Sequence, residues 1–137
     1  MDVDKILRKI FNRALYRYDT KCIEWLGACY TNGYGEVWDG NKTRTVHILV
    51  YECLVGLVPD GLELDHLCRN TICFNPYHVE PVTHKVNVLR GYSICAMQAR
   101  QTYCKRGHEF DYINAQGKRV CKTCIKIWYQ TYGYKRY

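Results

Sequence analysis

The spacing of cysteine and histidine residues constrains the fold of this chain more than any other feature. Cys68, Cys73 and His78 lie close together in the segment 64–87, which reads LDHLCRNTICFNPYHVEPVTHKVN. Thiolate sulfur and imidazole nitrogen are the usual ligands of structural zinc. The chain has nine cysteines, which in a secreted protein would suggest disulfide bonds, but its amino terminus lacks the apolar run of a signal peptide. We therefore expect metal binding rather than a disulfide framework.

A second set of metal-ligand type lies towards the carboxyl terminus. It has the pattern Cys104-x3-His108 followed by Cys121-x2-Cys124. The alternative, a redox-active pair at Cys121 and Cys124, needs a thioredoxin-like βαβ pattern that this segment lacks. The spacing predicts a zinc ribbon over 104–124.

The first segment also contains residues that suit a different kind of metal. Asp65 and Asn87 offer oxygen atoms, which hard cations such as Mg²⁺ prefer. His66 lies beside Asp65, and a neutral imidazole is the usual general base near pH 7. A base beside a hard-cation site is typical of metal-assisted hydrolysis.

Charge is distributed unevenly along the 137 residues. The formal net charge is +7, and residues 98–137 carry nine basic and two acidic side chains, whereas residues 22–97 have a net charge of −3. Basic termini around an acidic centre favour an enzyme that binds phosphates and places a cation centrally. No apolar run reaches the roughly 18 residues of a membrane span, so we expect no membrane contact and a cytoplasmic location.

Hydrophobic periodicity predicts an α+β chain. We expect an amphipathic helix over 3–17, an antiparallel ribbon of short strands within 22–46, and a buried helix over 47–56. Strands over 62–64 and 79–82 should be followed by a helix from Thr83 to Arg90. Residues 91–102 have the pattern of a linker or a weak helix.

The run HLCRNTICFNPYH resembles the zinc-containing branch of the HNH or His-Me finger endonucleases, also called ββα-metal nucleases. That branch includes His-Cys box homing endonucleases and small phage HNH enzymes. The resemblance extends from CIEWLGACYTNGYG to CKRGH and CKTC, over most of the chain. It implies a small ββα-metal core with an antiparallel ribbon, two structural zinc sites and a carboxyl-terminal zinc ribbon.

The resemblance also implies roles for single residues. His66 would be the general base, Asn75 would orient its loop, and Asp65 and Asn87 would hold Mg²⁺ or Mn²⁺. Cys22 would complete the first zinc site, with Cys29 as the alternative. Family members often have His-Arg where this chain has His47-Ile48, so a phosphate-binding arginine is missing at that position and Lys42 or Arg44 would have to replace it.

Together these features predict a phage-type or homing-type DNA endonuclease. We expect a nuclease domain over 1–97 and a zinc ribbon with a basic aromatic tail over 98–137. The partner is double-stranded DNA, with a homodimer as an open possibility, in the cytoplasm of a bacterial host. The residues expected to contact DNA are basic: Lys42, Arg44, Arg106, Lys118, Arg119 and Lys126.

Two other classes of protein compete with this interpretation. A non-catalytic zinc-finger DNA-binding protein would use the same scaffold, but it would not need Asp65, His66 and Asn87. A zinc-dependent nucleobase deaminase would need a Pro-Cys-x-x-Cys motif, which the chain does not contain.

Overall fold

The structure, a computed structural model, describes residues 2–133 and divides into two compact units, 1–87 and 88–137. Four separate two-stranded antiparallel sheets and five α-helices form the described part of the chain. The division falls inside one helix, α3, and the domain boundary expected after residue 97 stays a prediction. None of the helices in residues 2–133 is long and apolar enough to cross a membrane.

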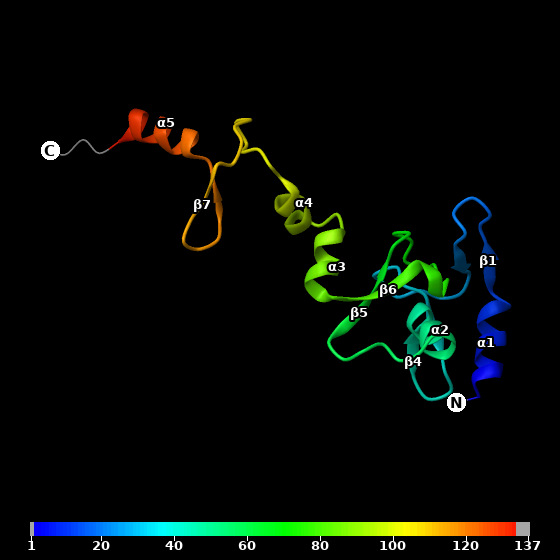
Figure 1. Cartoon of the computed structure of the whole chain (residues 1–137). Helices are drawn as coiled ribbons and strands as arrows, with labels where there is room; N and C mark the ends of the chain where they lie inside the picture. The colour runs from blue at the N-terminus through cyan, green and yellow to red at the C-terminus, as the bar shows by residue number, and fades with distance from the viewer. Residues whose placement is uncertain (1, 134–137) are drawn as a thin grey trace. The chain divides into compact units, whose positions relative to one another are not determined.

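The elements follow one another in the order drawn in Figure 1. They are α1 (Val3–Phe11), β1 (Ala14–Tyr16), β2 (Ile23–Trp25), β3 (Glu36–Trp38), β4 (Thr43–Thr45), α2 (Val46–Leu54), β5 (Leu62–His66), the 3₁₀ turn η1 (Pro76–His78), β6 (Val79–Thr83), α3 (His84–Arg90), α4 (Ile94–Arg100), β7 (Tyr112–Ile113), β8 (Arg119–Val120) and α5 (Lys122–Tyr132).

The predicted helix over 3–17 is correct only in its first part. Helix α1 begins after Asp2, whose side chain accepts a hydrogen bond from the backbone N–H of Lys5, and it ends at Phe11. Residues 14–16 form strand β1 instead, because they pair with residues 23–25 of β2. Tertiary pairing outweighs a weak helical preference at the end of an amphipathic pattern.

The ribbon and the buried helix agree with the sequence. Strands β3 and β4 form a two-stranded hairpin whose turn is closed by the Asp39 carboxylate, which accepts from the backbone N–H groups of Asn41 and Lys42. Helix α2 follows directly and ends before Gly56, which has a φ of +146°. Residues 94–100 form a helix, α4, so this part of the open linker segment is helical.

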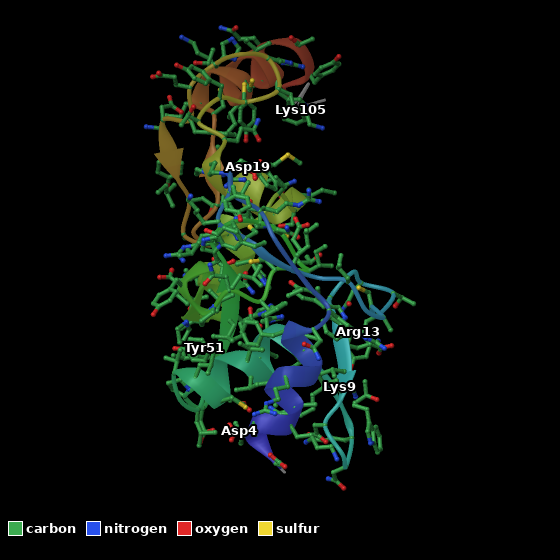
Figure 2. All side chains as sticks on the ribbon, turned by 90° about the vertical axis from the view of Figure 1, so that its right-hand side faces the viewer. Asp4, Lys9, Arg13, Asp19, Tyr51 and Lys105 are labelled. Carbon is green, nitrogen blue, oxygen red and sulfur yellow. The ribbon has the colours of Figure 1, made fainter. Side chains whose placement is uncertain are left out.

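The core of the N-terminal unit lies between α1, α2 and the loop before η1. Phe74 is 1% exposed, and its ring meets the edge of Phe11 at a centroid distance of 5.4 Å. Figure 2, where Lys9 marks α1 and Tyr51 marks α2, shows these two helices side by side. The buried apolar residues of this core are Ile6, Ile10, Trp25, Val37, Val46, Leu49, Val50 and Phe74.

Strands β5 and β6 and helix α3 position the residues of interest. The two strands pair antiparallel from Leu62 with Thr83 to His66 with Val79. Thr83 then accepts from the backbone N–H of Val86 at 3.4 Å, as a residue at the start of a helix does. Hence β5 ends at His66, and α3 begins beside the first residue of β5.

Candidate active site and metal centres

Four side chains of the N-terminal unit form a compact cysteine and histidine cluster. The ligand atoms of Cys22, Cys68, Cys73 and His78 all lie within 4.8 Å of one another. The His78 Nδ1 atom is 3.5 Å from the Cys22 Sγ and 3.7 Å from the Cys73 Sγ. A tetrahedral zinc with bonds of about 2.0–2.3 Å needs ligand separations of roughly 3.5–3.8 Å. The cluster therefore has the composition and the close spacing of a tetrahedral zinc site.

Three separate pieces of chain contribute to this cluster. Cys22 precedes β2, Cys68 follows β5, and Cys73 pairs in a bridge with Glu24 of β2. Cys29 is exposed and lies outside the cluster, with its Sγ near the backbone oxygen of Gly27. Burial raises the pKa of the Cys73 thiol to about 12, and a bound cation would favour its thiolate.

His66 lies at the end of β5 and is 5% exposed. Its Nε2 atom is 2.8 Å from the backbone oxygen of Cys73. A carbonyl oxygen only accepts hydrogen bonds, so Nε2 carries the ring proton and Nδ1 carries the lone pair. Burial lowers the pKa of His66 below its ordinary value of 6.5. The ring is thus neutral at pH 7, and Nδ1 is the atom that accepts a proton.

Asn75 connects the loop after His66 to the segment before β2. Its Nδ2 group donates to the backbone oxygen of Lys21 at 2.8 Å, and its Oδ1 accepts from the backbone N–H of Tyr77 at 3.0 Å. These bonds hold the loop that contains the Cys73 oxygen. The role of Asn75 in orienting the His66 loop stays a prediction.

The two predicted cation ligands lie on β5 and α3. The Asp65 side chain is 2% exposed and forms an ion pair with Arg69. The Asn87 Nδ2 group donates to the Glu63 carboxylate at 2.7 Å, and the exposed His84 ring contacts the same carboxylate at 3.1 Å. Residues 63 and 65 lie on the same face of β5 because side chains alternate along a strand. The carboxylate and amide oxygens here are the donor set that Mg²⁺ or Mn²⁺ takes.

The sequence did not lead us to include Glu63 in the site, although its position two residues before Asp65 indicated it. A carboxylate two residues before Asp65 on a predicted strand must share its face, and the helix with Asn87 was also predicted. Arg69 was missed for a different reason. Its contact with Asp65 depends on a backbone φ of +57°, which no sequence pattern indicates for arginine.

His47 is a further residue that the sequence did not assign. It lies in the first turn of α2, is 6% exposed, and its ring centroid lies 4.4 Å from that of His66. Its Nδ1 atom is buried without a hydrogen-bond partner. Burial, with a smaller effect of His66, lowers the pKa of His47 to about 3. His47, Glu63 and Asn87 help to line a cavity of about 500 Å³.

The C-terminal unit contains a second cluster of the same composition. The ligand atoms of Cys104, His108, Cys121 and Cys124 lie within 4.8 Å of one another. The Cys104 and Cys124 sulfur atoms are 3.6 Å apart, and His108 Nδ1 is 3.3 Å from the Cys124 Sγ. These separations also suit a tetrahedral zinc.

The basic residues proposed for DNA contact differ in their surroundings. Arg44 forms an ion pair with Glu52, and the Arg119 guanidinium donates to the backbone oxygens of Gln98 and Gln101. The other four are exposed: Lys42, Arg106, Lys118 and Lys126. The tail residues Tyr134, Lys135, Arg136 and Tyr137 lie outside the described residues.

Comparison with known proteins assigns the central segment to a family. Residues 44–89, from β4 through most of α3, match the family model described as HNH endonuclease. This segment is therefore similar to HNH endonuclease domains. It contains Asp65, His66, Asn75, Asn87 and three residues of the first cluster, whereas the second cluster lies outside it.

Two phage proteins resemble part of this chain. Protein 7.7 of Escherichia phage T7 is 41% identical over 66 residues, which are 48% of this chain and 51% of that protein. Protein 2.8 of the same phage is 36% identical over 66 residues, or 48% of this chain and 45% of that protein. The chain spans about half the length of the curated relatives it matches. No solved structure matches it.

Proposed function

We propose that this chain is a metal-dependent DNA endonuclease with a ββα-metal core formed by β5, β6 and α3. The observation that carries the proposal is the orientation of His66. The Cys73 oxygen binds its Nε2–H, so the basic Nδ1 atom is the one left for a substrate water. The HNH family of residues 44–89 supports nuclease activity.

The reaction we propose is hydrolysis of a phosphodiester. His66 Nδ1 takes a proton from a water molecule as the water oxygen bonds to phosphorus. The bond from phosphorus to the 3′ oxygen breaks, and that oxygen takes a proton from solvent. The products are a 5′-phosphate and a 3′-hydroxyl.

Asp65 and Asn87 would hold a cation of the Mg²⁺ or Mn²⁺ type, with Glu63 beside them. Such a cation supplies charge neutralisation at the phosphate and at the leaving oxygen. Asp65 is buried and Asn87 is held by Glu63, so both ligands are positioned before substrate binds. This preorganisation lowers the cost of reaching the transition state.

The two cysteine and histidine clusters would hold structural zinc ions. The first would fix the Cys73 oxygen and so the His66 ring. The second would give the C-terminal unit its structure, with exposed Arg106, Lys118 and Lys126 binding the phosphate backbone of double-stranded DNA. With relatives in a bacteriophage, the site of action would be the cytoplasm of a bacterial host.

Plasmid cleavage with the zinc-loaded protein and added Mg²⁺ tests this function. The variant His66→Gln keeps an N–H for the Cys73 oxygen but lacks a basic nitrogen. We expect it to lose roughly 10²–10⁴-fold in cleavage rate, the usual effect of removing a general base. His84→Gln, at an exposed neighbouring histidine, is the matched control and should keep most activity.

Two results would contradict the proposal. If His66→Gln cuts at nearly the rate of the unaltered protein, His66 is not the base. If the unaltered protein binds DNA but does not cut it with Mg²⁺ or Mn²⁺, the chain is a DNA-binding protein on a nuclease scaffold.

A further inference from the structure

A cavity of about 500 Å³ adjoins the candidate active site. Glu63 and Asn87 line it, and so does His47, whose ring centroid lies 4.4 Å from that of His66. Asn32, another lining residue, is exposed, so the cavity opens to solvent. A cavity of this volume can hold a small organic group. The proposed hydrolysis leaves the cavity itself without a role.

Two tyrosines of the loop between β2 and β3 line this cavity. Tyr30 and Tyr34 are both half-buried. The Tyr34 ring centroid lies 5.3 Å from that of His47 and 5.8 Å from that of His66. The Tyr30 N–H donates to the Tyr34 backbone oxygen at 2.9 Å, and Gly33 between them has a φ of +84°, which suits glycine. The backbone of both tyrosines is therefore held in place before any ligand binds.

The rest of the lining is mostly apolar and opposes a phosphate group. Its apolar side chains include Ile48, Val58 and Leu62. Among the described residues that line the cavity, none is lysine or arginine, and Glu63 carries a carboxylate. Burial keeps His47 neutral by lowering its pKa to about 3. Tyrosine rings and apolar side chains without positive charge suit a flat, neutral ring rather than an anion.

His47 gives an independent sign that a polar ligand belongs here. Its side chain is 6% exposed, and its Nδ1 atom is buried with no hydrogen-bond partner among the described residues. A buried polar atom without a partner costs free energy. A ligand in the cavity that forms a hydrogen bond with this ring would recover the cost.

The position of the cavity indicates which part of a DNA substrate can reach it. Because the His47 and Tyr34 rings lie beside His66, a base bound there belongs to a nucleotide next to the phosphate that is attacked. In a duplex such a base is paired and stacked. It can enter a pocket only after it has flipped out of the duplex.

We propose that this cavity, the base pocket, binds a nucleobase that has flipped out of the duplex beside the scissile phosphate, with its ring stacked on Tyr34. The inference rests on the proposed nuclease function. Stacking on an aromatic side chain replaces the contacts that the base loses with its neighbours. The base pocket thereby directs cleavage to positions where a base pair opens easily.

The test compares the binding of two labelled duplexes of equal length. One is fully paired, and the other contains a central C·C mismatch, whose bases flip out at a lower cost. Fluorescence anisotropy measures the affinity of the full chain, with zinc bound and without Mg²⁺, for each duplex. We expect the mismatched duplex to bind about 10-fold more tightly, because less free energy is needed to unpair its bases.

The variant Val58→Trp fills the base pocket from the loop between α2 and β5. We expect it to bind the two duplexes with equal affinity. Val55→Trp is the matched control, because Val55 is exposed and is not among the described residues that line the pocket. This control should keep the preference for the mismatch.

A second pair of variants tests the stacking on Tyr34. Tyr34→Leu should lose most of the preference, since stacking of one base on an aromatic ring contributes roughly 10-fold to affinity. Tyr34→Phe keeps the ring and should keep the preference. Zinc content and circular dichroism report folding, and if Val58→Trp does not fold, the two Tyr34 variants decide.

Two results would overturn the proposal. One is equal affinity of the unaltered protein for both duplexes, and the other is a preference that Val58→Trp and Tyr34→Leu both retain. Plasmid cleavage separates these results from failure of the proposed function. A chain that prefers the mismatch but does not cut with Mg²⁺ or Mn²⁺ has a pocket for an unpaired base and is not a nuclease.

Discussion

The two cysteine and histidine clusters have the same composition but different surroundings. The first gathers residues from before β2 to η1 and lies beside the apolar core that contains Trp25 and Phe74. The second uses only residues 104–124, and among the described residues of its unit only Ala96 and Cys121 are buried. In the N-terminal unit a zinc ion would stabilise a fold that already has an apolar core. In the C-terminal unit the zinc ion would take the place of such a core.

This difference has a consequence for function. The backbone of Cys73 links the first cluster directly to His66, so a zinc ion there would affect both stability and the proposed chemistry. The described residues of the second cluster make no such link, and the exposed basic residues around it suit a binding role. Under the proposed function, the same ligands would serve a catalytic loop in one unit and a small scaffold in the other.

The largest expected effect is loss of structure in the C-terminal unit. We expect Cys121→Ser to abolish the second zinc site and unfold residues 88–133, because zinc binding contributes on the order of 10–16 kcal/mol to such small domains. Amide NMR signals of that unit should collapse into the unfolded range, while those of residues 2–87 stay in place. Zinc content should fall from about two to about one per chain.

The exposed Cys95 offers a control in the same unit, and Cys95→Ser should change neither signals nor zinc content. If Cys121→Ser also weakens DNA binding, the slope of log K against log salt should flatten by roughly 0.9 for each lost phosphate contact. If the C-terminal unit stays ordered in Cys121→Ser, its fold does not depend on zinc, and the proposed difference between the two clusters is wrong.

A smaller effect is expected at the first cluster, where a core remains. Cys22→Ser should lose one zinc and at least about 3 kcal/mol of unfolding free energy, because loss of a metal site is among the most damaging single changes. The core should still form at low temperature, but cleavage should fall because the Cys73 oxygen no longer fixes His66. Denaturant unfolding, zinc analysis and plasmid cleavage measure the three effects.

Cys29→Ser is the matched control, since Cys29 is exposed and outside the cluster. If Cys29→Ser loses the zinc and Cys22→Ser does not, the two cysteines exchange roles and the geometry of the first cluster is wrong.

The smallest effect concerns acid stability of the N-terminal unit alone. The pKa of His47 is about 3 in the folded chain and about 6.5 in an unfolded one. Between these two pH values His47 is protonated in the unfolded chain but not in the folded one. The contribution of neutral His47 to the free energy of unfolding is therefore fully present above pH 6.5 and is lost as the pH falls. At pH 5.5 the loss should be about 1.4 kcal/mol, and it should stop growing as the pH approaches the folded pKa of about 3.

His47→Phe, which keeps a buried ring but cannot be protonated, should remove this part of the pH dependence. His84→Phe changes an exposed histidine and should leave it intact. Acid also releases zinc from both variants, so this contribution cancels when their pH profiles are compared. Equal pH profiles for His47→Phe and the unaltered protein would show that His47 is not buried in its neutral form.

Local spacing in the sequence was sufficient to predict several features. The pattern Cys104-x3-His108 with Cys121-x2-Cys124 predicts a cluster because its ligands are close in the chain. The hairpin turn at Asp39, the buried helix α2 and the strands β5 and β6 agree with residue periodicity and turn chemistry. The run HLCRNTICFNPYH, which begins at His66, also resembles the HNH endonucleases, whose family model matches residues 44–89.

Only tertiary structure decided which distant groups meet. Cys22 rather than Cys29 reaches the first cluster because β2 pairs with β1 and bridges to Cys73. The same pairing makes residues 14–16 a strand instead of the end of a helix. The contacts of Glu63 with Asn87 and of Arg69 with Asp65 depend on the packing of α3 and on a left-handed residue. Short-range patterns determine which chemical groups are present, whereas the energy of packing separate segments determines which of them touch.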